Sequence, residues 1–109
     1  MKRFCFACDL VDNQALINEY IDWHKRVWPE IRQSIVDSGI KSMEIYHVGD
    51  RMFMVMETDD EFTLENKARM DAENPRVQEW EQLMWKYQKA LPFANRGEKW
   101  MLMERIYNL

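Results

Sequence analysis

Residues 52–56, Met-Phe-Met-Val-Met, are apolar at every position. A strand places successive side chains on opposite faces of a sheet, so a strand of this composition needs cover on both faces. The run follows the only strong tight-turn signal in this part of the chain, Gly49-Asp50. We therefore predict a strand over 51–58, joined through a hairpin to a strand over 40–48.

The residues before this hairpin predict a strand over 2–9 and then a helical region in two pieces. The first piece covers 13–25, with Asp12 as its N-cap. Pro29 suits the first position of a second piece, which ends near residue 38 because Gly39 follows as a stop signal.

A second helical region is predicted after the hairpin, again in two pieces. Asp59 or Asp60 caps the first piece, which fades near residue 73. Asn74-Pro75 opens the second piece, and Leu91-Pro92 ends it. Apolar residues alternate over 99–107, which predicts the last strand.

The order of elements is βαββαβ, which predicts an α+β fold of the ferredoxin-like type, with an antiparallel sheet and helices on one face. The chain shows no linker or internal repeat, so residues 1–109 are expected to form a single domain. The strand over 51–58 then has an apolar face that no helix covers. A second copy of the sheet would cover it, so we predict a homodimer.

The charge pattern limits the classes of partner. The formal net charge is −4 and no basic stripe is present, which argues against nucleic acid and anionic membrane surfaces as partners. No apolar run has the length of a signal segment or a membrane span. We expect a soluble, cytoplasmic protein.

Cys5 and Cys8 form a C-x-x-C pattern inside the predicted first strand. The odd spacing places the thiols on opposite faces, roughly 10 Å apart along the strand. A disulfide needs Cα atoms about 4.4–6.8 Å apart. We therefore interpret both residues as small packing residues and predict no metal site.

Tyr20 and His24 are the main candidates for chemistry. They lie four residues apart on the apolar stripe of the predicted helix over 13–25, so their side chains are neighbours one turn apart. A phenol and an imidazole on a sheet-facing stripe suit a polar ligand and a proton transfer. The competing interpretation is a half-buried histidine that bonds a backbone carbonyl. His47, Trp80 and Tyr87 are weaker candidates, since each is also typical of core or rim positions.

Several segments resemble the L-rhamnose mutarotase family, in the same order along essentially the whole chain. The segments are Glu19-Tyr20-x-x-x-His24, Val27-Trp28-Pro29-Glu30, Gly39, Ile45-Tyr46, Val77-Gln78-x-Trp80 and the final segment Met103-Glu104-Arg105-Ile106-Tyr107-Asn108-Leu109.

The resemblance implies a dimeric α/β-barrel enzyme without a cofactor, an isomerase that interconverts the α and β anomers of a 6-deoxyhexose. Carried over by position, His24 matches the family's proton donor, Tyr20 a substrate-binding tyrosine and Trp80 the first of two binding tryptophans. Two positions depart from the pattern: Glu81 stands where the family has the second tryptophan, and Met43 where it has another substrate tyrosine. Both are retained as substrate-binding candidates.

Three alternatives stay open from the sequence. The first concerns the substrate, which is L-rhamnose, L-fucose or another aldose. The same scaffold also carries small dimeric α/β-barrel monooxygenases. Finally, the chain could be a ligand-binding domain without catalysis, in which Tyr20 and His24 are ordinary core residues.

Overall fold

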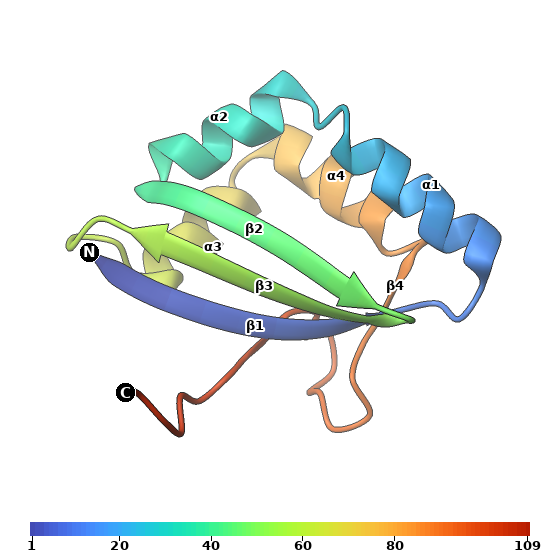
Figure 1. Ribbon diagram of the computed structural model, residues 1–109. Helices are drawn as coiled ribbons and strands as arrows, with labels where there is room; N and C mark the ends of the chain where they lie inside the picture. Colours follow the sequence, from blue (N-terminus) through green and yellow to red (C-terminus); the bar gives the residue numbers. More distant parts are fainter.

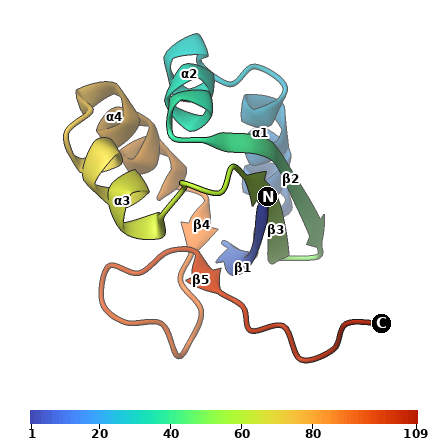
Figure 2. The same cartoon turned by 90° about the vertical axis from the view of Figure 1, so that its left-hand side faces the viewer.

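The computed structural model describes all residues from Met1 to Leu109. Four helices cover one face of an antiparallel sheet (Figures 1 and 2), which confirms the predicted α+β, ferredoxin-like arrangement. The elements are, in chain order, β1 (Lys2–Leu10), α1 (Gln14–His24), α2 (Pro29–Asp37), β2 (Ile40–Val48), β3 (Arg51–Thr58), α3 (Leu64–Ala72), α4 (Pro75–Met84), β4 (Gln88–Lys89) and β5 (Met101–Leu102).

The strand order β2-β3-β1-β4 places β3 near the middle of the sheet, with β5 also paired to β1. Alternate residues of β3 are buried on the helix side: Met52, Met54 and Met56. Phe53 lies on the opposite face and is 36% exposed. The helices therefore cover only one of the two apolar faces that the sequence predicted for this strand.

Two helix starts differ from the predictions. Asn13, not Asp12, caps α1, and its side chain accepts a hydrogen bond from the backbone N–H of Leu16. Thr63, not Asp59 or Asp60, caps α3 in the same way. In each case the chain offers more than one residue with a suitable oxygen, and the extended backbone at Asn13 and Thr63 decides which one acts.

The last predicted helix ends early. Its apolar stripe continues in sequence to Tyr87 and Leu91, which are buried, but α4 stops at Met84. The chain then turns, and β4 pairs antiparallel with Asp9 and Leu10 of β1. Pairing with a free sheet edge overrides the helical periodicity here.

The last predicted strand is also shorter than expected. Only β5 pairs, with Phe6 and Ala7 of β1, and Met103 adds one backbone hydrogen bond to Cys5. The following residues run away from the sheet (Figures 1 and 2). Alternation predicts a strand only where an edge is there to pair with it, and residues 104–109 pair with none in this chain.

Cys5 and Cys8 are free thiols, with Cys8 fully buried. They pair with Val55 and Met52 of β3 and so lie on opposite faces of the sheet, as predicted. Burial raises the pKa of the Cys8 thiol to about 11, which makes it an inert packing residue. None of the four helices combines the length and apolar character needed to cross a membrane.

Candidate active site

A cleft of about 660 Å³ lies between the sheet and the helices that cover it. Its lining includes Tyr20 and His24 from α1, Met43 from β2, and Trp80 and Glu81 from α4. The structure therefore brings the five candidate residues from the sequence to one cavity. Most of the remaining lining is apolar.

His24 is the last residue of α1, and its ring is held in a defined orientation. Its Nδ1 lies 2.8 Å from the backbone oxygen of Tyr20. A carbonyl oxygen only accepts, so Nδ1 carries a proton and donates it, and in the neutral ring Nε2 keeps a lone pair. Burial lowers the pKa of His24, and the bond to Tyr20 opposes this in part. The neutral ring is therefore the resting form near pH 7.

The chain direction changes directly after His24, as Pro29 predicted. The helix closes with a turn in which the Lys25 N–H bonds Asp22, and α2 begins at Pro29. The linking segment places the Trp28 ring against that of Trp80, with centroids 5.1 Å apart. The bend also brings Val27 and Ile31 into the cleft lining near the imidazole.

Tyr20 packs against the imidazole, with ring centroids 4.3 Å apart, and is only 4% exposed. Its hydroxyl oxygen accepts a hydrogen bond of 3.0 Å from the side-chain amide of Gln88. Burial raises the pKa of Tyr20, so the hydroxyl stays protonated and keeps its own proton to donate. The Gln88 Oε1 is buried without a partner, which marks this corner as a polar spot in an apolar cavity.

Trp80 is the centre of an aromatic cluster. Its ring makes edge-on contacts with Trp23 at 6.1 Å and with His24 at 6.0 Å between centroids. The side chain is 6% exposed, so Trp80 belongs to the core as well as to the cleft wall. Its aromatic surface is of the kind that packs against the C–H face of a sugar.

Glu81 forms an ion pair with Lys99, a residue that the sequence did not single out. The Lys99 Nζ donates to the Glu81 carboxylate at 2.6 Å and to the Glu81 backbone oxygen at 3.2 Å. It also lies 4.7 Å from the centre of the Trp85 ring. Lys99 is 10% exposed and Glu81 45%. The pair adds a charged, hydrogen-bonding edge to the cleft.

The profile of the family described as L-rhamnose mutarotase matches residues 3–109, nearly the whole chain. The chain belongs to the L-rhamnose mutarotase family. A relative from Xanthomonas campestris pv. campestris, an L-fucose mutarotase, is 45% identical over 111 residues, which cover 100% of this chain and 89% of that protein. A protein of Dictyostelium discoideum is 35% identical over 112 residues, covering 99% and 90%.

Two solved structures share the fold of this mutarotase-family chain. An L-rhamnose mutarotase from Formosa agariphila superposes with a TM-score of 0.74 at 19% identity, covering 100% of this chain and 99% of that one. Tetracenomycin F2 cyclase from Streptomyces glaucescens gives 0.61 at 15% identity, covering 100% and 97%. Family membership assigns the chain to the carbohydrate epimerases, a class of isomerases, and favours this class over the monooxygenase and non-catalytic alternatives.

Two of the weaker candidates, His47 and Tyr87, lie at the margin of this cleft or outside it. His47 is exposed at the end of β2, with Nδ1 3.1 Å from the Gly49 oxygen, and borders a neighbouring hollow. Tyr87 accepts a hydrogen bond from Trp23 and donates one to Glu19, so its hydroxyl is fully used inside the protein.

Several residues of the cleft wall were missed from the sequence: Trp85, Gln88, Lys99 and Trp100. They follow α4, where the periodic patterns predicted a longer helix and a strand rather than the return of the chain to β1, so the sequence did not indicate a cleft wall. Nothing in the structure brings together three or more metal-ligating side chains.

Proposed function

We propose that the protein is a mutarotase that interconverts the α and β anomers of L-fucose or L-rhamnose in the cleft around His24. The observation that carries the proposal is the position of His24 in the cleft wall, with Nδ1 bonded to Tyr20 and Nε2 left for proton transfer. The similarity to the Xanthomonas L-fucose mutarotase supports L-fucose. The family supports L-rhamnose.

The chemistry follows from what ring opening requires. The anomeric hydroxyl loses a proton, the ring oxygen gains one, and the bond between the ring oxygen and C1 breaks to leave an aldehyde. Rotation about C1–C2 and the reverse transfers close the ring as the other anomer. A group that releases a proton in one direction takes one up in the other, so His24 uses both of its protonation states in each cycle.

Different residues of the cleft suit different parts of the sugar. Trp80 offers an aromatic surface for the C–H face of the sugar, and Tyr20 donates a hydrogen bond to a ring hydroxyl. Glu81, held by Lys99, is our candidate for a second hydroxyl or for the second proton transfer. Met43 lies on the sheet side of the cleft, where its flexible side chain packs against an apolar part such as a deoxy carbon.

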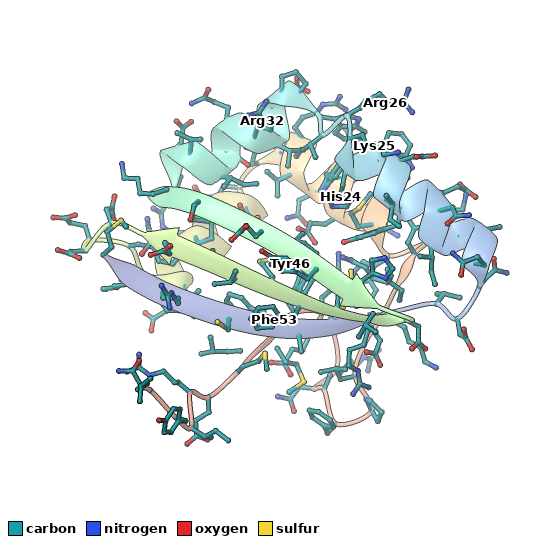
Figure 3. The ribbon with its side chains drawn as sticks, viewed as in Figure 1. His24, Lys25, Arg26, Arg32, Tyr46 and Phe53 are labelled. Carbon is teal, nitrogen blue, oxygen red and sulfur yellow. The ribbon has the colours of Figure 1, made fainter.

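We further propose that the enzyme acts as a homodimer. The face of the sheet without helices carries Tyr46 and Phe53 side by side, 6.5 Å between ring centroids (Figure 3). Beyond β5, Ile106 and Leu109 are almost fully exposed, and Tyr107 is 73% exposed. An apolar sheet face and an apolar tail on one small chain are suited to burial against a second copy. A cytoplasmic location also stays a prediction, to be tested by cell fractionation.

Saturation-transfer NMR between anomers tests the activity directly. We expect the protein to speed the exchange of L-fucose or L-rhamnose well above the buffer rate, and to leave D-glucose near that rate. Binding of either sugar without faster exchange would overturn the proposal and favour a non-catalytic binding domain.

A further inference from the structure

A second hollow, of about 410 Å³, adjoins the sugar cleft. The segment between α1 and α2, the helix α2 and the start of β2 form its walls. His24, Val27 and Met43 line both cavities, so a ligand that rests against His24 can extend from one into the other. We call this second hollow the basic groove.

The basic groove concentrates positive charge in a chain whose net charge is −4. Its lining holds four cationic side chains and no carboxylate. Figure 3 labels three of them together with His24: Lys25 and Arg26 directly after α1, and Arg32 on α2. The four are Lys25, Arg26, Arg32 and Lys41. This local positive charge is opposite in sign to the net charge of the protein.

The cations of the groove are largely unpaired. Only Lys25 has a carboxylate partner, Asp22 at 3.3 Å. Most other arginines and lysines of the chain do form ion pairs, including Arg51 with Asp9 and Arg76 with Glu30. Like charges around one hollow repel one another, and an anion placed among them would relieve that repulsion.

We propose that the basic groove binds an anionic group, a phosphate or a carboxylate, beside a sugar ring that lies against His24. Arg26 and Arg32 carry planar guanidinium groups, which suit two-point hydrogen bonding to either anion. A neutral 6-deoxyhexose has no anionic group that would pair with these cations. The anion is therefore either part of a charged aldose or a separate small ion that binds beside the sugar.

The test is a titration of the full-length protein with inorganic phosphate at low ionic strength, followed by amide chemical shifts. It needs no turnover, so its result is independent of whether the protein is a mutarotase. We expect saturable shifts at residues 24–27 and 40–43 that weaken as salt is added. No saturable shift at these residues in the wild-type protein would overturn the proposal.

A matched pair of triple variants locates the site. Arg26→Gln/Arg32→Gln/Lys41→Gln removes three groove cations and should weaken phosphate binding by about tenfold or more. The control variant removes three exposed cations elsewhere and changes the net charge equally: Lys89→Gln/Arg96→Gln/Arg105→Gln. Equal weakening in both variants would reduce the effect to net charge and overturn the groove as a site.

A second experiment, which rests on the proposed function, distinguishes an anion that is part of the sugar from a separate ion. If the sugar carries the charge, the anomer exchange of D-galacturonate should exceed that of D-galactose, and the groove variant should lose the difference. If the anion is separate, phosphate and L-fucose should bind together, and D-galacturonate should have no advantage.

Discussion

Breaking the ion pair between Glu81 and Lys99 should have unequal effects depending on which partner is removed. Lys99 is 10% exposed and Glu81 45%. Glu81→Leu leaves a buried ammonium group with only the backbone oxygen of residue 81, at 3.2 Å, and the Trp85 ring. Removing one partner of a buried pair costs about 3–5 kcal/mol, which the exposure of Glu81 reduces to about 2–3 kcal/mol.

Lys99→Met should be milder. It keeps the length and the apolar stem of the side chain, and it leaves a half-exposed carboxylate that water can solvate. We expect a loss of about 1 kcal/mol or less, as for partly exposed ion pairs. The double variant should recover part of the cost of Glu81→Leu, because no buried charge then remains unpaired.

Urea unfolding of the four proteins at pH 7 measures these differences, with equal slopes as the check that the unfolded states are comparable. If Lys99→Met destabilises as much as Glu81→Leu, or more, then Lys99 is not a buried charge that depends on Glu81. The Glu81–Lys99 pair would then not hold the cleft edge in a fixed geometry.

Three further results are expected. Burial lowers the pKa of His24 below its unfolded value of about 6.5, so at a pH just below this value the unfolded chain binds more protons than the folded one. The free energy of unfolding should therefore fall as the pH drops below about 6.5, and it should fall less in His24→Ala. Val55→Asp places a charge on the sheet face without helices and should give a monomer in sedimentation velocity, whereas an unchanged dimer would exclude that face as the interface. Gln88→Met removes the bond to the Tyr20 hydroxyl, so KM for the sugar should rise more than kcat falls; an equal KM would make Gln88 a packing residue.

The middle of the fold was predictable because its signals are local. The strands over 40–48 and 51–58 and the start of α2 at Pro29 follow from glycine, proline and apolar patterns within a few residues. The end of α4 and the short β5 were not predictable in this way. Both depend on where the free edge of β1 lies, and that edge is formed by residues far away in the sequence.

In the candidate site, too, the contacts between residues close in sequence were predictable, and those between distant residues were not. Tyr20 and His24 are neighbours through helix geometry alone, so their spacing predicted their contact. Lys99 reaches Glu81 across 18 residues, and its contact depends on the path of the chain after α4. Trp80 was predicted as a sugar-binding residue; the structure adds that it is deeply packed, so Trp80→Phe tests binding more cleanly than Trp80→Ala, which would cost about 3–5 kcal/mol of stability.

The most direct measurement is the anomer exchange rate of His24→Ala, with Tyr20→Phe as control and with folding checked for both. We expect His24→Ala to remain folded, to bind sugar, and to exchange anomers roughly 10²–10⁴-fold more slowly than the wild-type protein. Tyr20→Phe should weaken binding more than it slows the proton step. A folded His24→Ala protein that exchanges anomers at nearly the wild-type rate would contradict the assignment of His24 and make His47 the next residue to test.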